Sequence, residues 1–540
     1  MPEPARRAAL AVTVVACLGY LSLCWALRGF VADDSWISVR YAENLAAGAG
    51  PVWNPGGPRV EGYSNPALVG LEAVADAVGW SALGAARAVG VLSGLVCVLL
   101  VHRAGRAVVG PVAATAGAVL TAVSAPFALW AVGGLETTAT AAVLTAGVLQ
   151  LARPDGGRAG LAGALLAVLP WLRPEGLVVV LAVVVASEAP ALLRGGHRRR
   201  AARRLALAGG VPVLSQVALE GLRLIVYGHA LPNSVLYKSG TGETLGVALK
   251  FADESLPVLL LAGAGLLGLR HRGVLLAVPA LVYGIGSVGT LDSANPFSRF
   301  FMPVWPQVAL LAGVAVGAVA TLAVRWVRSA RARGAGHSVR RGAAAAAVLA
   351  GALALAAALV VPADVPRVSG WQERYMGCRA AARQEAARWL VDSTAPGTSF
   401  AVSDAGYVPA RAGGRTAIDS FMLNDPLIQR TGPLSPRQRA DVVHARRPDV
   451  LVLASRDPAT FDPVYPTERA LHEHPAAGDF RLRHVASGEP ACGYHLLLLE
   501  RSAPAGARVR ASSRCTTCGS AAGGRPPRVD GRRLAVGGRG

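Results

Sequence analysis

Long apolar runs separated by short polar segments make up most of the first two thirds of the chain. Each run approaches the ~20 residues that a helix needs to cross the hydrocarbon core of a membrane. With 53% hydrophobic and only 16% charged residues, the chain carries less charge than a soluble protein of its size. No small-residue cleavage site follows the first run, so we interpret it as a retained helix rather than a signal peptide. The pattern predicts eleven membrane-spanning helices, at residues 8–28, 82–101, 108–125, 136–151, 159–170, 176–193, 205–226, 256–269, 273–289, 302–324 and 342–361.

Positive charge is concentrated in alternate polar segments. A net charge of +21 by itself would also fit a nucleic-acid-binding protein. The arginines, however, cluster between apolar runs, and the positive-inside rule places such clusters in the cytoplasm. We therefore predict a multi-pass plasma-membrane protein in the lipid bilayer, with a cytoplasmic N-terminus and no nucleic-acid partner. The odd number of helices then places the C-terminal region outside. The clusters lie at residues 6–7, 103–106, 153–158, 194–204, 270–272 and 325–341.

The chain changes character after the last apolar run. Residues 371–391 have a helical pattern, and three short runs at 399–402, 449–453 and 494–499 are typical of strands. We predict a membrane domain over residues 1–361, an extracytoplasmic α/β domain over 362–502 and a disordered Arg/Gly-rich tail over 503–540. Cys378 and Cys492 both lie in the α/β domain and are candidates for a disulfide.

Two adjacent carboxylates, Asp33 and Asp34, follow the first predicted helix. Side by side at a membrane surface they repel each other, and the low dielectric constant raises the cost of ionising both. Groups kept at such a cost typically bind a metal, accept a proton or face a cation. The alternative is a helix N-cap, a common position for Asp. The long polar and aromatic segment that follows, up to Pro66, favours a functional site.

Further polar residues fall on the same predicted side of the membrane, in separate loops. Each has a simpler interpretation: Glu136 as a helix cap, Arg173 and Glu175 as a mutual ion pair, and isolated cations as interfacial anchors. Their shared side, next to Asp33 and Asp34, is the stronger evidence for a single site. The residues are Glu136, Arg173, Glu175, His229, Lys238 and Arg299.

This combination suits glycosyl transfer from a lipid-phosphate-linked sugar. A carboxylate can remove the proton of the acceptor hydroxyl, and cations can stabilise the charge that develops on the leaving phosphate. We assign donor or phosphate binding to Lys238, Arg299, Arg173 and His229, and possible stacking on sugar faces to Trp36, Tyr41, Trp53 and Tyr63. Nucleotide sugars are cytoplasmic donors, so a site on the outer face needs a lipid-linked one.

The segment from Asp33 to Leu45 also resembles GT-C membrane glycosyltransferases, together with Trp53-Asn54-Pro55-Gly56 and Val60-Glu61-Gly62-Tyr63-Ser64-Asn65-Pro66. Within them it is similar to the actinobacterial terminal β-(1→2)-arabinofuranosyltransferase family. Shorter motifs with the same resemblance are Gly134-Leu135-Glu136-Thr137, Arg173-Pro174-Glu175-Gly176, Tyr227-Gly228-His229 to Lys238-Ser239-Gly240, Arg299-Phe300-Phe301, Asp404-Ala405-Gly406, Ile418-Asp419-Ser420 and Asn424-Asp425.

The resemblance implies a GT-C fold, an inverting reaction, a polyprenyl-phosphate-linked sugar donor and a cell-envelope glycan acceptor. It makes Asp33 or Asp34 the general base; we favour Asp33, with Asp34 positioning the acceptor or a cation. It leaves open whether a divalent cation is needed, and no other cofactor is implied. The substrate-binding candidates are Trp36, Arg40, Tyr41, Asn54, Glu61, Tyr63, Asn65, Glu136 and Glu175.

Two other classes of protein compete with this interpretation. A transporter or flippase of a lipid-linked glycan would more often carry charged residues or broken helices at the membrane midplane. The predicted helices are nearly free of them. A glycan-binding scaffold or sensor would need far fewer helices as an anchor. We therefore expect a transferase.

Overall fold

The structure of the protein is a computed structural model, and the residues up to Arg501 form one compact unit. It describes residues 3–155, 157–194, 198–238, 246–269, 271–286, 296–332, 364–489 and 492–502. The helix predicted at 342–361 and the tail at 503–540 lie outside the described residues.

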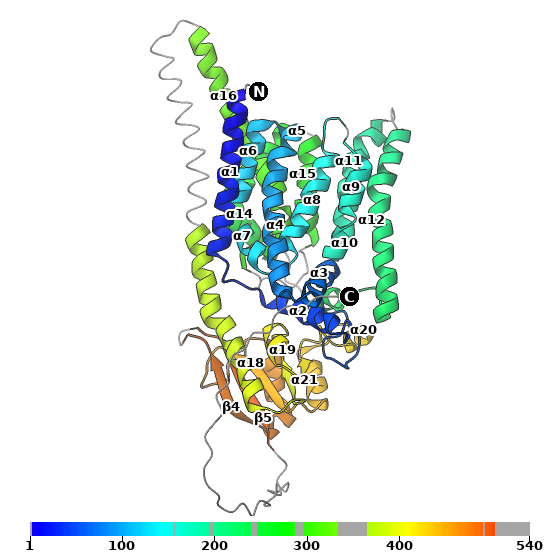
Figure 1. Ribbon diagram of the computed structural model, residues 1–540, viewed down its shortest axis with the longest axis vertical. Helices are drawn as coiled ribbons and strands as arrows, with labels where there is room; N and C mark the ends of the chain where they lie inside the picture. Colours follow the sequence, from blue (N-terminus) through cyan, green and yellow to red (C-terminus); the bar gives the residue numbers. More distant parts are fainter. Residues whose placement is uncertain are drawn as a thin grey trace, which may run out of the picture. The chain divides into compact units, whose positions relative to one another are not determined.

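A bundle of long helices forms the first part of this unit (Figure 1). Within the described ranges, six helices are long and apolar enough to cross a membrane, or seven if the bent pair α6–α7 counts as one. Every predicted span in this part of the chain contains a helix. The helices are α1 (Glu3–Ala26), α4 (Ala82–Arg103), α5 (Gly105–Val109), α6 (Pro111–Ala122), α7 (Ala125–Val132), α8 (Thr137–Leu151), α9 (Ala159–Leu166), α10 (Leu169–Leu172), α11 (Gly176–Arg194), α12 (Arg198–Tyr227), α13 (Asn233–Lys238), α14 (Gly246–Leu269), α15 (His271–Gly286), η1 (Pro296–Val304) and α16 (Trp305–Ala332).

Two helices extend further than their apolar runs. Helix α14 begins at Gly246, whereas the hydrophobic pattern starts at residue 256, and α12 begins at Arg198 instead of residue 205. Lys250, Asp253 and Glu254 precede the apolar run but lie within the helix α14. Hydropathy marks where a helix is apolar, and charged residues with good helix propensity continue it beyond that point.

The long segment after α1 folds into two further helices, α2 (Asp33–Ala46) and α3 (Pro66–Ala77). The N-cap of α2 is Ala32, so Asp33 and Asp34 occupy the first helical turn and neither caps the helix. Carboxylates in a first turn interact favourably with the helix dipole. In Figure 1, α2 and α3 lie between the bundle and the C-terminal part of the unit.

A five-stranded sheet forms the centre of the C-terminal part, which we call the α/β region. Its strand order is β2-β1-β3-β5-β4; β1 is parallel to β2 and β3, whereas β5 is antiparallel to β3 and β4. The predicted strands correspond to β1, β3 and β5. Both edge strands, β2 and β4, were not predicted; most side chains of β4 are at least partly exposed. The strands are β1 (Ser399–Val402), β2 (Thr416–Asp419), β3 (Val450–Ser455), β4 (Phe480–Ser487) and β5 (His495–Arg501).

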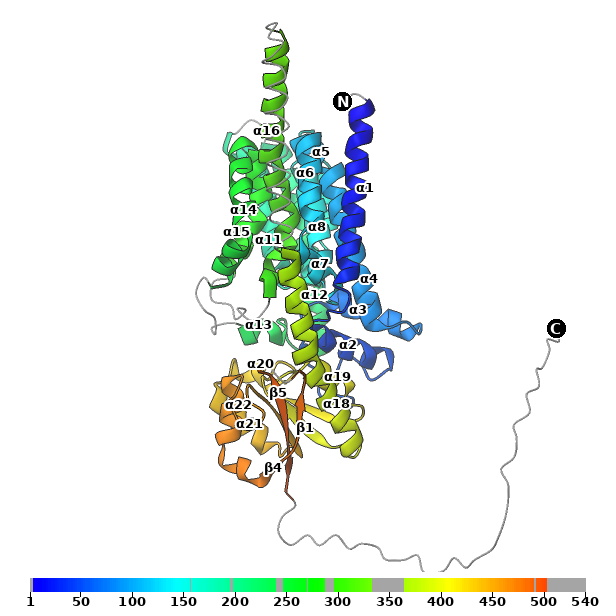
Figure 2. The same ribbon diagram turned by 90° about the vertical axis from the view of Figure 1, so that its left-hand side faces the viewer.

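Helices cover both faces of this sheet (Figure 2). Phe400 and Val402 of β1 pack with Ala386 and Leu390 of α18, whereas the intervening Ala401 belongs to a second core. This alternation is expected of a strand, whose successive side chains point to opposite faces. The covering helices are α18 (Ala381–Ser393), α19 (Tyr407–Arg411), α21 (Pro436–Ala445) and α22 (Pro466–Glu473), with α20 (Leu427–Thr431) nearby.

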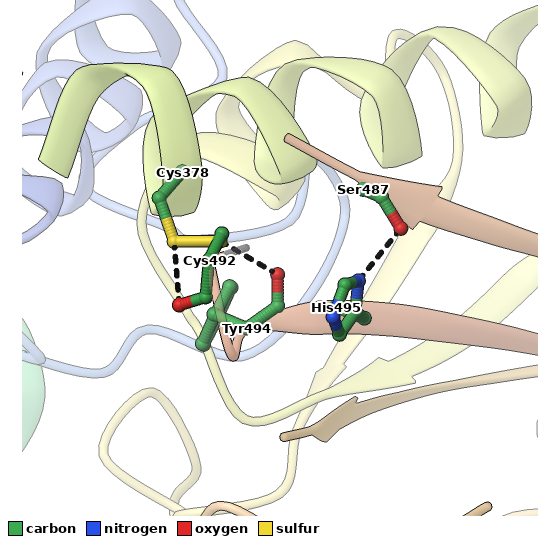
Figure 3. Close-up of a disulfide and its surroundings, with 5 residues drawn as sticks. All are labelled: Cys378, Ser487, Cys492, Tyr494 and His495. Carbon is green, nitrogen blue, oxygen red and sulfur yellow. Dashed lines mark hydrogen bonds between the residues drawn. A yellow bond between two sulfur atoms is a disulfide. The ribbon is translucent and has the colours of Figure 1, made fainter. Parts of the chain in front are cut away.

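One long helix leads into the α/β region and is bonded to its sheet. Residues 364–375 are helical, a π-helical turn η2 (Met376–Ala380) follows, and α18 continues without a break. Cys378 in the π turn forms a disulfide with Cys492, with 5.3 Å between their Cα atoms (Figure 3). The candidate disulfide is therefore present. It fixes the helix beside the β4–β5 connection, where the Ser487 hydroxyl and His495 Nδ1 are 2.7 Å apart.

Candidate functional site

A cavity of about 1720 Å³ lies between the helix bundle and the α/β region and is lined by residues of both. From the α/β region it receives the carboxyl ends of the parallel strands β1 and β2, with Asp404 and Asp419. The order β2-β1-β3 makes this end a topological switch point, where open α/β sheets usually bind ligands. The location of the cavity is therefore consistent with a functional site.

The bundle contributes an apolar wall to this cavity. Val178 and Val179 of α11 and Val282 and Ile285 of α15 line it. Val178 is 61% exposed and Ile285 is 74% exposed, so apolar side chains of both helices are accessible and not packed in the core. This wall offers an apolar surface to a lipid chain.

Asp33 lies at the boundary between the bundle and the α/β region. Its Oδ1 accepts a hydrogen bond from the backbone N–H of Tyr407 at 3.0 Å and lies 3.5 Å from Nε of Arg383. Burial raises the pKa of Asp33 to about 6, although Arg383 opposes the shift. A side chain at Gly406 would collide with the backbone carbonyl of Asp33, so only glycine lets the β1–α19 loop approach this closely.

Arg383 connects Asp33 to the end of β1. Its Nε donates to Asp404 Oδ2 at 2.8 Å, and its NH1 donates to the Tyr375 hydroxyl at 3.0 Å. The Tyr494 hydroxyl donates to the same Asp404 oxygen. Arg383 and Asp404 are both buried. The Arg383 guanidinium group thus contacts two carboxylates, those of Asp33 and Asp404. Arg383 and Asp404 both belong to the α/β region.

Asp34 faces the bundle instead. Its Oδ2 accepts a hydrogen bond at 2.8 Å from NH1 of Arg299, whose NH2 lies 3.7 Å from Glu136 Oε1. Arg173 donates to the same Glu136 oxygen at 2.9 Å and pairs with Glu175. Four predicted site residues, Glu136, Arg173, Glu175 and Arg299, therefore form one network with Asp34.

Further contacts hold this network in place. Asn65 donates to Glu136 Oε2 at 2.9 Å and accepts from the Ser38 hydroxyl at 3.0 Å. Phe297 and Ser298, directly before Arg299, have φ values of 52° and 49°. Consecutive non-glycine residues in this left-handed region are strained, a feature that clusters at functional sites. The strain here accompanies the positioning of Arg299.

Several predicted substrate-binding residues connect the two parts of the molecule and do not line the cavity. Arg40 donates to the carbonyls of Trp53, at 2.6 Å, and Pro409. The Asn54 side chain makes two hydrogen bonds to the backbone of Ala417, at 2.8 and 3.1 Å. Their hydrogen-bonding groups are used in docking α2 and its loop onto the α/β region.

The remaining predicted residues have separate positions. Trp36 packs edge-on against Tyr407, and buried Tyr41 donates to Asn424 at 3.2 Å. Tyr63 lines the cavity, and its hydroxyl is 2.7 Å from that of Tyr227. Glu61 forms a buried ion pair with Arg223 at 2.9 Å. His229 is exposed and is not part of the cavity lining. Lys238 is the last residue of α13, and its side chain lies outside the described part of the structure.

The helix at residues 364–393 contributes lining residues that the sequence reasoning missed. Arg383 is the clearest case: with Ala382, Ala386 and Leu390 it lies on the buried side of α18. A charged residue on the apolar face of an amphipathic helix was a readable signal. The missed lining residues of this helix are Trp371, Arg374, Tyr375, Cys378, Arg379 and Arg383. Among the residues that the structure describes, no group of three or more His, Cys, Asp or Glu side chains is arranged to hold a metal ion.

Comparison with known proteins gives a fold but no established activity. Residues 372–495 match a domain of unknown function, DUF8728. ArnT from Cupriavidus metallidurans, solved with bound undecaprenyl phosphate, has a similar structure, with a TM-score of 0.53, 15% identity, and coverage of 92% of this chain and 98% of ArnT. No curated protein sequence matches the chain.

The archaeal oligosaccharyltransferase AglB from Archaeoglobus fulgidus, in complex with an inhibitory peptide and a dolichol-phosphate, is also similar. Its TM-score is 0.54 at 14% identity, with 84% of this chain and 70% of AglB covered. These similarities show that the chain shares the fold of ArnT and AglB, which in this structure is a bundle of apolar helices followed by a C-terminal region built around a sheet, as the sequence predicted.

Proposed function

We propose that the protein is a membrane glycosyltransferase that moves a sugar from a polyprenyl-phosphate donor to a hydroxyl group of a glycan acceptor, with inversion. One observation carries this proposal: Asp33 and Asp34 stand at a cavity that has an apolar wall on one side and arginines on both. A lipid-linked phosphosugar needs an apolar path for its tail and cations for its phosphate. ArnT and AglB were solved with polyprenyl-type phosphates, which supports the same class of donor.

Asp33 is the general base in this proposal. The acceptor oxygen forms its bond to the anomeric carbon as its proton passes to the Asp33 carboxylate. The bond between that carbon and the phosphate oxygen breaks, and the polyprenyl phosphate keeps the bonding electrons. A pKa near 6 suits this role, because the group is ionised at neutral pH and still takes a proton readily.

The donor phosphate lies on the bundle side of Asp34. Arg299 Nε is buried without a hydrogen-bond partner among the described residues, and Arg299 and Arg173 both line the cavity. Their guanidinium groups stabilise the charge of the leaving phosphate, and Asp34 holds Arg299 in position. Lys238 remains a candidate phosphate ligand because Ser234, Val235 and Tyr237 of α13 line the same cavity.

The orientation in the membrane, the sugar and the acceptor are inferred from the sequence. The distribution of arginines favours a cytoplasmic N-terminus and an extracytoplasmic α/β region in the plasma membrane. The resemblance to the arabinofuranosyltransferase family favours arabinofuranose as the sugar and a cell-envelope glycan as the acceptor. We give His229 no role in this proposal, because it is exposed and does not line the cavity.

The proposal is tested with the full-length protein in nanodiscs and a panel of radiolabelled donors. The donors are decaprenyl-phosphoryl arabinofuranose, a decaprenyl-phosphoryl hexose and a nucleotide sugar, each with a short arabinan acceptor. We expect transfer from the arabinose lipid and none from the nucleotide sugar. Transfer from the hexose lipid alone would show that the transferred sugar is a hexose and would leave the proposed class of enzyme unchanged. Movement of a lipid-linked glycan across the bilayer, without transfer from any donor, would identify a flippase and refute the proposal.

A further inference from the structure

Two arginines of the α/β region line the cavity without ionic partners. Arg374 and Arg379 belong to the helix at residues 364–393, where Arg374 is exposed and Arg379 is half-buried. Within the described ranges, neither makes an ion pair or a hydrogen bond with another side chain. Arg379 lies over the Tyr494 ring, 5.1 Å from its centre, which orients the guanidinium but leaves its donors unused. Two such groups in one cavity form a site for an anion.

The π-helical turn explains why both arginines reach the same cavity. In a regular α-helix, residues five apart in sequence point in different directions, since 3.6 residues complete one turn. Arg379 lies within the π turn Met376–Ala380, which begins after Arg374 and adds one residue to the helical turn between them. Arg383, four residues after Arg379, lies in the regular helix α18. The three guanidinium groups therefore lie on the cavity side of one continuous helix.

Arg374 and Arg379 lie on the opposite wall of the cavity from the proposed site of the donor phosphate. Tyr375, between the two arginines, accepts a hydrogen bond from Arg383, and Arg383 pairs with Asp33. The apolar surface that suits a lipid tail is formed by α11 and α15, on the bundle wall. An arginine pair on the α/β wall, on the same helix as the Arg383 that pairs with Asp33, is placed for the substrate whose proton Asp33 removes.

We propose that Arg374 and Arg379 bind an anionic group, a phosphate or carboxylate, on the glycan acceptor. This inference rests on the proposed function and names the class of its acceptor. Three acidic residues, Asp404, Asp419 and Glu489, also line this wall, and Asp404 is paired with Arg383. Asp419 accepts hydrogen bonds from the Phe421 N–H at 2.8 Å and the Asn424 N–H at 2.9 Å. Among the carboxylates of the described α/β region that line the cavity, only the Glu489 side chain has no cation or hydrogen-bond donor beside it. Two uncommitted guanidinium groups against one carboxylate favour an anion over a cation.

The test compares two acceptors that differ only in charge. One is an arabinofuranose disaccharide on a short alkyl linker that ends in a hydroxyl group, and the other is the same compound with a phosphate on that hydroxyl. Transfer kinetics from decaprenyl-phosphoryl arabinofuranose are measured for wild type, the double variant Arg374→Gln/Arg379→Gln, and Arg388→Gln. Arg388 is an exposed arginine of the same helix outside the cavity lining and serves as the matched control.

We expect the wild type and the Arg388 variant to have a KM at least about tenfold lower for the phosphorylated acceptor, as expected for a charge-assisted contact. The double variant should lose this preference while its kcat and its KM for the donor stay unchanged. Equal KM values for both acceptors in wild type, a preference that survives in the double variant, or a raised KM for the donor would each overturn the inference.

Direct binding separates this inference from the proposed function. Both disaccharides, labelled with a fluorophore, are titrated onto the same three proteins without donor. If the wild type binds the phosphorylated form at least about tenfold more tightly than the double variant does, the anion site is supported even when no transfer is detected. Equal affinities refute the anion site even if transfer proceeds normally. Matching thermal unfolding midpoints of the three proteins show that the variants fold.

Discussion

The two walls of the cavity differ in their arginines, although Arg383 of the α/β wall is, like those of the bundle wall, buried and paired with carboxylates. On the bundle wall, Arg173 and Arg299 are buried and bound to carboxylates, with Glu136 between them. On the α/β wall, Arg374 and Arg379 have no such partners within the described residues. A cation held by fixed carboxylates is preorganised, because its position does not change when the substrate binds. An uncommitted cation near solvent is suited to select ligands by charge.

Asp33 and Asp34 divide between these walls. Asp34 is held by Arg299 of the bundle, whereas Asp33 is held by Arg383 and the Tyr407 N–H of the α/β region. The two residues are adjacent in sequence, so their different environments come entirely from tertiary structure. The site is therefore complete only when the α/β region is docked on the bundle.

The largest effect should come from removing one carboxylate at a time. Asp33→Asn removes the base and should lower kcat at least about 10³-fold, within the range for general base catalysis. Asp34→Asn leaves the base and removes only a contact to Arg299, so we expect about a tenfold loss, mainly as a higher KM for the donor. Transfer rates measured over a range of donor concentrations give kcat and the KM for the donor in both variants. Equal losses in the two variants would contradict the division between the walls.

The disulfide should have the next largest effect. Replacing Cys378 and Cys492 by Ser releases a cross-link that spans 114 residues, so the α/β region should lose about 2–4 kcal/mol of stability. Denaturant unfolding followed by a probe in this region measures the change. Wild type treated with a reductant is the control and should shift by the same amount. Unchanged unfolding in both samples would show that the disulfide does not hold the α/β wall.

A moderate effect is expected at the contact between α2 and the α/β region. Arg40→Ala removes hydrogen bonds to the carbonyls of Trp53 and Pro409 and should cost about 2 kcal/mol. Hydrogen exchange should then increase in the segments around these two residues. Arg40→Lys keeps the charge and should recover only part of the protection, because lysine cannot reach both carbonyls in the same geometry. Wild-type exchange in the alanine variant would contradict a docking role.

The smallest effect is expected at a second contact of α2. Glu43 and Arg411 form an ion pair whose side chains are 33% and 37% exposed. Solvent screens such pairs, so Glu43→Gln should cost no more than about 0.5 kcal/mol. Thermal unfolding at low and high salt measures it, and the difference from wild type should vanish at high salt. A salt-independent loss above about 2 kcal/mol would show that this contact, and not Arg40, carries the docking.

The bundle wall was predictable from the sequence because its residues are near apolar runs and share one predicted side. Glu136, Arg173 and Arg299 were found in this way. On the α/β wall, Asp404 and Asp419 lie in motifs that the sequence singled out, but the arginines were missed, since Arg383 reaches Asp33 from 350 positions away in sequence. Periodicity shows that Arg383 lies on a buried helix face but cannot name its partner.

The loop after α1 shows a second limit of sequence reasoning. Its polar and aromatic residues, including Arg40 and Asn54, have the composition of a binding site. In the structure they bind the backbone of the α/β region. Protein carbonyls and sugar hydroxyls need the same hydrogen-bonding partners, so composition alone does not separate docking from substrate binding.

The most direct test of the central claim is the pH dependence of kcat/KM for wild type and for Arg383→Gln. In wild type, the rate should fall about tenfold per pH unit below about pH 6, because Asp33 must be ionised to act as base. Arg383 lowers the pKa of Asp33, so removing its charge should move this limb to higher pH, whereas Arg383→Lys should leave it near the wild-type position. Variants are compared only where thermal unfolding shows a folded protein. A flat profile between about pH 5 and 7, or a limb that stays in place without Arg383, would contradict the assignment of Asp33 as a base held by the α/β region.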